Sequence, residues 1–277
     1  TLTVTGATAN NKTYNANTTA TLSATGSLSG VISGDTVTLS AASVTASFAD
    51  KNVGTGKTVT TSGYSISGTD SGNYSLTQPT TTADITAKAL TITGVTADNK
   101  VYNATTTATL VNTSAALSGV ISGETVTLST SSATGAFVNK NVGTGKTVTT
   151  SGYSISGTDS GNYSLTQPSV TADITVKSLS VDGLTAVDKV YNASSTAIVT
   201  GTAALLTPSS PGSGTSVDGK SFTGDSLFLR GTAAGSFANA NAGVNKVVTV
   251  TGLSLTGSDA SNYTLPDPSL TATIEPA

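Results

Sequence analysis

The feature that most constrains this chain is an internal repeat of about 90 residues. The segment from Lys51 to Pro79 is identical to the segment from Lys140 to Pro168, an offset of 89 residues. A third, more divergent version of its last part, GSDASNYTLPDP, runs from Gly257 to Pro268. Solenoid units span roughly 20 to 50 residues, whereas this length suits a small domain with its own core. The repeat predicts three tandem domains, called here copies one, two and three: residues 1–87, 88–177 and 178–277.

Each copy contains short segments in which apolar or β-branched residues alternate with polar ones. In copy one these segments are residues 1–6, 35–40, 57–67 and 80–87. Alternation at period 2 is typical of strands that bury one face, and Gly, Asn, Asp and Pro between the segments favour turns. No stretch combines a helical pattern with helix caps. The prediction is an all-β chain of three tandem immunoglobulin-like antiparallel β-sandwiches.

The joints between copies contain no flexible spacer. ITAKALTITG (85–94) and ITVKSLSVDG (174–183) join the last strand of one copy to the first strand of the next. Because such connectors leave little room for swinging, we expect the copies to form an elongated, semi-rigid rod. Copy three differs by an inserted loop at about 206–221. This loop fits either a binding role or neutral growth, since closure entropy rises slowly with loop length.

Large aromatic residues recur at matched positions in all three copies. Small cores depend on aromatic side chains for buried area, so we expect these residues in the cores, with a sugar-stacking platform as the alternative. The predicted core aromatics are Tyr14, Phe48 and Tyr74 in copy one, Tyr102, Phe137 and Tyr163 in copy two, and Tyr191, Phe237 and Tyr263 in copy three.

Composition argues against several classes of function. The chain has no His and no Cys, which removes the commonest acid/base group, thiolate metal sites and disulfides. Its 12 basic and 15 acidic residues are scattered singly, so no basic stripe for nucleic acid is present. No apolar run approaches the ~20 residues of a membrane span. We therefore expect a protein that is not an enzyme, takes no cofactor, binds no nucleic acid and does not insert into a membrane through this segment.

The repeated GTDSGN turn offers a candidate cation site. Its Asp and Asn oxygens are two ligands per copy, against the six to eight that calcium takes. The alternative is a purely structural turn, in which Asp70 caps the turn and Gly72 and Asn73 supply unusual backbone angles. The calcium candidates are Asp70, Asn73, Asp159, Asn162, Asp259 and Asn262.

A covalent Lys–Asn crosslink is a further hypothesis. Such a bond requires a buried, neutral lysine beside an asparagine and a carboxylic acid. The residues that recur at matched positions are Lys57, Asn73 and Asp35 in copy one, Lys146, Asn162 and Glu124 in copy two, and Lys246, Asn262 and Asp225 in copy three.

Several motifs together resemble a known family. They are K-x-Y-N-A-x-[ST]-[ST]-A at the head of each copy, NVGTGKTVT, SGTDSGNYSLTQP and TADIT. This set resembles the YDG repeat of large bacterial adhesins and filamentous-haemagglutinin-like surface exoproteins, with Tyr-Asn-Ala in place of Tyr-Asp-Gly. The resemblance implies an extracellular protein on an outer-membrane-associated bacterial cell surface, with roles in adhesion and biofilms. It implies no catalytic residue.

These observations predict a structural stalk that holds a binding region away from the cell. Its partners are then neighbouring copies of the same chain, and a host or matrix ligand stays unassigned. Two alternatives remain. The chain is a self-assembling filament subunit in which the edge strand TLTVTG pairs with a segment such as TATIEPA of a neighbour, or it is a module whose flat Thr-x-Thr faces bind glycans or ice.

Overall fold

The computed structural model describes residues 1–277. It consists of thirty strands, turns and three short 3₁₀ helices, with no α-helix, so the predicted all-β class is confirmed. No helix in it has the length and apolar character that crossing a membrane requires. The same order of elements recurs along the chain because the same sequence pattern recurs.

The bounds of the elements follow the three copies. Copy one contains β1 (Leu2–Ala9), β2 (Lys12–Thr13), β3 (Thr19–Ala20), β4 (Leu22–Ser29), β5 (Thr38–Ser40), β6 (Thr45–Phe48), β7 (Gly54–Ser62), β8 (Ser65–Ser67), η1 (Ser71–Asn73), β9 (Leu76–Thr77) and β10 (Thr80–Thr86). Copy two contains β11 (Lys88–Thr93), β12 (Thr96–Ala97), β13 (Lys100–Val101), β14 (Thr107–Ala108), β15 (Leu110–Val111), β16 (Ala116–Ser118), β17 (Thr127–Ser129), β18 (Thr134–Phe137), β19 (Gly143–Ser151), β20 (Ser154–Ser156), η2 (Ser160–Asn162), β21 (Tyr163–Leu165) and β22 (Ser169–Thr175). Strand β23 (Lys177–Ser178) spans the boundary between copies two and three. Copy three then contains β24 (Val181–Val187), β25 (Lys189–Val190), β26 (Thr196–Leu205), β27 (Phe228–Phe237), β28 (Gly243–Thr256), η3 (Ala260–Asn262), β29 (Tyr263–Thr264) and β30 (Ser269–Glu275).

Contacts divide the chain into two compact units that do not coincide with the copies. Unit one comprises 1–94, 113–132 and 152–168, and unit two comprises 95–112, 133–151 and 169–277. The division passes through copy two. Each unit therefore contains one complete copy, part of copy two and one of the two junctions between copies. The division into three domains at 87/88 and 177/178 stays a prediction.

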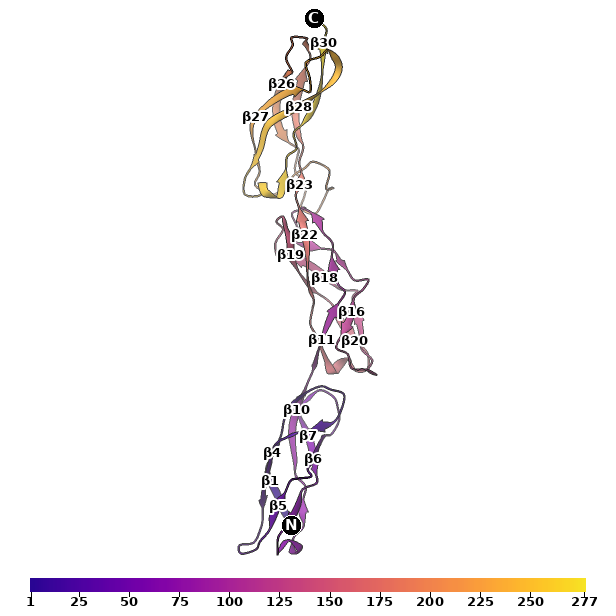
Figure 1. Ribbon diagram of the computed structural model, residues 1–277, viewed down its shortest axis with the longest axis vertical. Helices are drawn as coiled ribbons and strands as arrows, with labels where there is room; N and C mark the ends of the chain where they lie inside the picture. The colour runs from indigo at the N-terminus through magenta and orange to yellow at the C-terminus, as the bar shows by residue number, and fades with distance from the viewer. The chain divides into compact units, whose positions relative to one another are not determined.

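Copy one is built from three small sheets. Their strand orders are β4-β1-β9, β2-β10-β7-β6-β3 and β5-β8. In β10 the alternation puts Ala83 and Ile85 inside and leaves Thr80 and Thr82 exposed. Strand β7 does the same with Val59 and Thr61, and it lies antiparallel beside β10 (Figure 1). Period-2 patterning thus produces a half-buried sheet, as the sequence predicts.

Copy three extends this plan into longer strands. Its main sheet has the order β24-β26-β27-β28-β30-β25, and β27 and β28 form a long antiparallel hairpin (Figure 1). The 57–67 segment, expected as one strand, is divided in copy one into β7 and β8, and Gly63 between them has φ +89°. In copy three the equivalent strand runs from Gly243 to Thr256 without a break.

The apolar cores extend past the sequence boundaries between copies. In unit one, Tyr14 and Ile85 of copy one share a core with Leu90 and Tyr163 of copy two. In unit two, Tyr102 and Ile174 of copy two share a core with Phe222 and Tyr263 of copy three. A separate cluster around Phe237 and Val248 fills the far part of copy three. Neighbouring copies are therefore joined through buried side chains.

The two segments named for filament pairing are not edge strands of their sheets. The TLTVTG segment lies in β1, which is the middle strand of its sheet and pairs with β4 on one side and with β9 at Leu2 and Thr3 on the other. The TATIEPA segment lies mostly in β30, which pairs with β28 and with β25. Both strands therefore have partner strands on each side inside their own copy.

Candidate functional site: the junctions between copies

The K-x-Y-N-A motif folds into a loop organised around its lysine. In copy two, Lys100 Nζ donates hydrogen bonds to Asn103 Oδ1 at 2.9 Å, to the carbonyl oxygen of Thr105 at 2.7 Å and to that of Thr107 at 2.9 Å. The ammonium also lies 5.2 Å from the ring centroid of Phe137. Lys12 and Lys189 hold the equivalent loops of the other copies in the same way. These bonds hold the loop in one conformation. The motif tyrosine comes early in the sequence of its copy, but it lies beside the last strand and therefore at the carboxy-terminal end of the copy.

A second set of residues lies at the opposite end of each copy. We call this set the acceptor, because in copies two and three it receives the end of the preceding copy. In copy two, Tyr163 Oη donates to Glu124 Oε2 at 2.5 Å and accepts from the Ile121 backbone N–H at 3.0 Å. Asp159 Oδ2 accepts from the Thr125 backbone N–H at 2.9 Å. These bonds bring the GD/GE turn and the GTDSGN turn together. The repeated turn thus contributes one side of this acceptor.

The first junction, in unit one, joins the tyrosine loop of copy one to the acceptor of copy two. Tyr14 Oη donates to Glu124, and the rings of Tyr14 and Tyr163 meet edge to face at 5.5 Å. Lys51 Nζ lies 2.7 Å from Glu124 Oε1 and 3.6 Å from Asp159 Oδ1. The Glu124 side chain is only 5% exposed, so burial and charge pairing occur at the same point.

Asn162 adds a polar clasp to this junction. Its Oδ1 accepts from the Val53 backbone N–H at 2.9 Å, and its Nδ2 donates to Asn52 Oδ1 at 3.3 Å. Asn162 is 6% exposed, so both polar ends of its amide are satisfied by copy one. A buried amide with both ends paired fixes register as well as contact.

The second junction, in unit two, repeats this geometry with different acids. Tyr102 Oη donates to Asp225 Oδ2 at 2.8 Å, and Lys140 Nζ lies 2.5 Å from Asp225 Oδ1 and 3.7 Å from Asp259 Oδ1. The amide of Asn262 accepts from Val142 N–H at 2.9 Å and donates to Asn141 at 3.3 Å. A Glu in copy two and an Asp in copy three thus support the same arrangement.

The environment keeps these groups in complementary charge states. Burial and the hydrogen bond to Asp225 raise the pKa of Tyr102 to about 12. Burial and the hydrogen bond to Glu124 raise the pKa of Tyr163 to about 12. Burial alone would raise the pKa of Glu124, but hydrogen bonds from Lys51, Tyr14 and Tyr163 outweigh it and lower that pKa. At neutral pH the junction therefore holds neutral tyrosines, a carboxylate and an ammonium.

The inserted loop of copy three packs across the second junction. The buried Lys177, which is 1% exposed, donates from Nζ to the carbonyl oxygen of Thr215 at 2.5 Å and to Asp218 Oδ1 at 2.7 Å. The Gly212 backbone N–H donates to the carbonyl oxygen of Asn103 in copy two at 2.8 Å. The hydrogen bond from Lys177 lowers the pKa of Asp218 to about 2. The loop thus acts as a strap that the first junction does not have.

Most predicted core aromatics are buried, and the exceptions are Tyr74 in copy one and Tyr191 in copy three. The buried ones are Tyr14, Phe48, Tyr102, Phe137, Tyr163, Phe237 and Tyr263. Tyr74 is half-buried, and the core prediction is wrong for Tyr191, which is 42% exposed. The reason is that the core tyrosines at this position, Tyr14 and Tyr102, are covered by the copy that follows them, and no copy covers Tyr191 in this chain.

Five of the six calcium candidates use a side-chain oxygen in hydrogen bonds within the protein. Asp70, Asp159 and Asp259 each accept a backbone N–H from the neighbouring turn at 2.8 or 2.9 Å. Asn162 and Asn262 are the clasps described above, while Asn73 is exposed. No group of three or more His, Cys, Asp or Glu side chains is gathered in a metal-binding arrangement. The unusual backbone angle expected at Gly72 or Asn73 belongs instead to Gly68, at φ +121°.

The crosslink candidates are not brought together in any copy. Lys57 Nζ pairs with Asp50 at 2.6 Å, and Lys146 and Lys246 pair with Asn139 and Asn239 at 2.7 Å. The candidate acids bond tyrosines instead: Asp35 bonds Tyr74, Glu124 bonds Tyr163 and Asp225 bonds Tyr263. The hypothesis fails because each candidate lysine is held by its own glycine loop, away from the GTDSGN turn.

Sequence reasoning missed the lysines that matter most. Lys12, Lys100 and Lys189 stand two residues before the motif tyrosine in every copy, and this recurrence was the available signal. Lys51 and Lys140 recur in the first two copies and are replaced by Ala240 in the third. This difference between the copies does not by itself predict a role for the lysines, because the acid with which each lysine pairs lies in the next copy.

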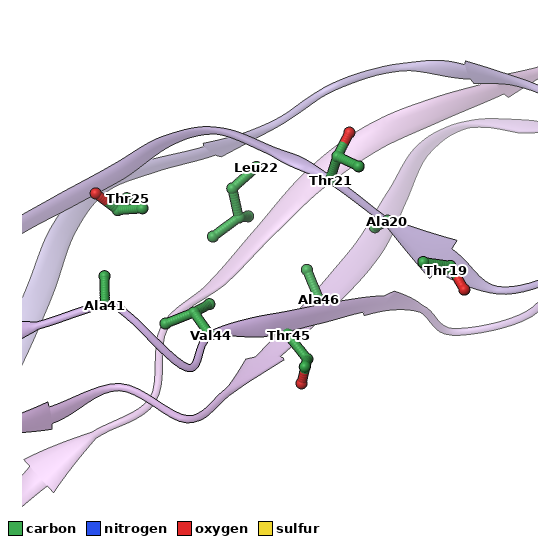
Figure 2. Close-up of a pocket in the computed structure, with 9 residues that line it drawn as sticks. All are labelled: Thr19, Ala20, Thr21, Leu22, Thr25, Ala41, Val44, Thr45 and Ala46. Atoms are coloured by element: carbon green, nitrogen blue, oxygen red, sulfur yellow. The ribbon is translucent and has the colours of Figure 1, made fainter.

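A shallow hollow on the side of copy one is the other candidate site. Its volume is about 410 Å³, and it lies between the β3–β4 segment and the β5–β6 segment. Figure 2 shows Leu22, Ala41 and Ala46 directed into the gap, with Thr21 and Thr45 directed away from it. No charged side chain lines it. It offers apolar surface and no chemistry specific to a ligand.

Comparison with known proteins agrees with the repeat seen in the structure. The profile of the YDG domain family matches residues 1–83, 86–172 and 175–272. No curated protein matches the chain in sequence. Among solved structures, Drosophila N-cadherin EC1-3 is similar at 8% identity and a TM-score of 0.18, over 80% of this chain and 77% of that one, and a TM-score this low carries no argument.

Three successive matches cover nearly the whole chain, and each contains one lysine loop, one acceptor and one GTDSGN-type turn. The chain therefore belongs to the YDG domain family and carries three tandem YDG domains.

Proposed function

We propose that this chain is a stalk or spacer segment of a secreted or surface-attached bacterial adhesin or fibre, in which tandem domains carry a binding region away from the cell. In this proposal each copy is an immunoglobulin-like β-sandwich, the copies form a rod, and the segment performs no catalysis. The observation that carries the proposal is the repeated junction, in which a buried carboxylate, a lysine, two tyrosines and an asparagine join one copy to the next.

The physical support comes from how such a joint restricts motion. A spacer is useful only if its copies do not fold back on one another, and a short connector alone permits bending. Each junction adds a shared apolar core, a charge-assisted hydrogen bond and an asparagine clasp to the connector. Interactions of three kinds at one joint fix its direction better than any one of them.

Small-angle X-ray scattering of the purified chain tests the stalk directly. A rod of three copies gives a maximum dimension close to three times that of one copy and a cross-section of one copy. A chain with the junction variants Glu124→Gln and Asp225→Asn should bend more and show a broader distance distribution. A compact globule from the parent chain would contradict the proposal.

The proposed location has its own test. Antibodies against the chain should label intact source cells, and external protease should remove the label without loss of a cytoplasmic marker. Label that appears only after the cells are broken open would exclude a surface location while leaving the rod geometry untouched.

A second candidate function rests on a ladder of threonines. Thr60 pairs with Thr80 and Thr58 pairs with Thr82 across β7 and β10, and all four are exposed. Regular rows of hydroxyl and methyl groups suit a glycan-binding or ice-binding module, although threonine also favours strands by itself. Glycan arrays and ice-shaping assays test it, with Thr58→Lys and Thr60→Lys as variants that should abolish any signal.

A further inference from the structure

Copy one presents the same kind of acceptor that copies two and three use at the junctions. Its members are Ile32, Asp35, Asp70, Asn73 and Tyr74, and we call them the amino-terminal face. Sequence register equates Asp35 with Glu124 and Asp225, and Asn73 with the clasp residues Asn162 and Asn262. Every type of group that receives a preceding copy at the two junctions is therefore present here.

The amino-terminal face is already in its receiving geometry. Tyr74 Oη donates to Asp35 Oδ2 at 2.5 Å and accepts from the Ile32 backbone N–H at 3.1 Å. Asp70 Oδ2 accepts from the Thr36 backbone N–H at 2.8 Å. The matching bonds at the second junction are 2.6, 3.0 and 2.9 Å. Because nothing has to rearrange, docking on this face requires little reorganisation.

Three members of this face, Ile32, Asn73 and Tyr74, are more exposed in copy one than their counterparts are in the other copies. Ile32 is 67% exposed, whereas Ile121 at the equivalent position is partly buried and Phe222 is 2% exposed against the Tyr102 ring. Asn73 is exposed, whereas Asn162 and Asn262 are 6% and 2% exposed. The face combines an apolar residue, two carboxylates and an amide, in the arrangement that meets a preceding copy twice elsewhere in this chain.

We infer that the amino-terminal face docks the carboxy-terminal end of another YDG copy, specifically one that carries lysine and valine at the positions of Lys51 and Val53. The lysine places its ammonium between Asp35 and Asp70, as Lys51 does between Glu124 and Asp159. The valine N–H meets Asn73, and the loop tyrosine covers Ile32 and bonds Asp35. The charges are complementary, and the contact continues an interface that the chain itself makes twice.

The end of copy three is a poor match for this face. It keeps the loop tyrosine, Tyr191, and the asparagine Asn241, but it has Ala240 where the others have lysine and Ala242 where they have valine. The end of copy three therefore has no ammonium group to pair with Asp35 and Asp70. The inference predicts an order of copies, in which a copy of the lysine type precedes copy one and the copy-three end does not dock onto it.

Labelling of a single cysteine tests the inference in the full chain. The protein has no cysteine, so Ile32→Cys introduces one unique thiol on the face. A second chain carries an additional segment, residues 89–177, fused ahead of Thr1, which reproduces the native lysine before the first strand. The fusion holds the two surfaces at a high effective concentration. We expect the thiol of the fused chain to react with a maleimide reagent at least about tenfold more slowly than that of the parent.

The matched control changes the added segment alone. Lys140→Ala with Val142→Ala in that segment copies the alanines that copy three already tolerates, so it should fold, and it should restore most of the parent labelling rate. Val217→Cys, at a position 86% exposed, should label at the same rate in every chain.

Two results would overturn the inference. One is equal labelling of Ile32→Cys in the parent and the fused chain. The other is slow, concentration-dependent labelling in the parent, with dimers in sedimentation, which would show that the copy-three end of a second molecule occupies the face despite its alanines. Neither result bears on the stalk proposal, which concerns the junctions within the chain.

Discussion

At the scale of single residues, the Tyr-Asn-Ala motif holds an alanine where the backbone favours glycine. Ala16, Ala104 and Ala193 have φ of 64°, 58° and 61°. An L-residue in this left-handed region costs roughly 1–2 kcal/mol, whereas glycine adopts it freely. The Tyr-Asp-Gly that gives the family its name therefore suits this loop geometry, and this chain departs from it at a cost in stability.

Ala104→Gly should consequently stabilise the protein, contrary to the usual effect of glycine. Relief of the left-handed strain outweighs the greater entropy of glycine in the unfolded chain, for a net gain of up to about 1 kcal/mol. Urea denaturation measures it. The control Ala108→Gly, in the ordinary strand β14 of the same copy, should destabilise the protein. A loss of stability from Ala104→Gly would mean that the alanine methyl contributes packing that outweighs the strain.

The strap of copy three makes a pH-dependent contribution through Asp218. Its pKa is lowered to about 2 by the hydrogen bond from Lys177. A carboxyl group with a lowered pKa in the folded state adds stability above its unfolded pKa, near ~4, and that stability is lost as pH falls toward 2. Asp218→Asn should cost about 1–3 kcal/mol at pH 7, since it leaves Lys177 buried beside a neutral group.

The measurement is the difference in unfolding free energy between the parent and Asp218→Asn from pH 7 to pH 2. The difference should be constant above pH 5 and shrink between pH 4 and pH 2. A difference that does not change over this range would show that the charge of Asp218 contributes nothing.

At the scale of elements, the repeated GTDSGN segment depends on one glycine. Gly157 has φ +115°, and a Cβ there would lie 2.4 Å from the carbonyl oxygen of Thr125. The strand before it and the turn of Thr125 can therefore meet only with glycine at this position. Gly68 and Gly257 make the same close approach in the other copies.

Gly157→Ala should destabilise the protein by about 3 kcal/mol, because backbone strain and a backbone clash combine. Gly123→Ala is the matched control: its φ is +86° but no atom lies within 4 Å of the place that the added methyl group would take, so only the strain of about 1 kcal/mol remains. Thermal unfolding by circular dichroism ranks the two. Equal effects would show that the turn relaxes around the methyl group.

Element by element, the sequence predicted strands well and their limits less well. TLTVTG and TTTADITA became β1 and β10 because their alternation matches a half-buried sheet. Only Thr38–Ser40 of the DTVTLS segment forms a strand, β5, because Asp35 lies in a turn and accepts a hydrogen bond from Tyr74. The candidate site escaped prediction because its partners lie in different copies: nothing local in the sequence pairs Lys51 with Glu124, which is 73 residues away.

At the scale of the whole molecule, the junctions should couple the stability of neighbouring copies. In tandem repeats each interface term adds to the intrinsic stability of its neighbours. Glu124→Gln removes the charge that Lys51 and Tyr14 meet, while Asp35→Asn makes the same kind of change where no copy is docked. Calorimetry should show that Glu124→Gln separates the unfolding of the first two copies and that Asp35→Asn leaves the profile nearly unchanged. Identical profiles for both variants would show that the junction transmits no stability.

The equivalence of Lys51 and Lys140 has a consequence for how genes of this kind can change length. Recombination within the identical stretch that removes residues 52–140 would leave Lys51 followed by Asn141, and Tyr14 and Lys51 would then face Asp225 and Asp259. The hydrogen bonds and ion pairs of the deleted junction would be replaced by those of the junction that remains. Loss or gain of one 89-residue period therefore preserves the contacts of a junction, and selection is free to change the number of copies one at a time.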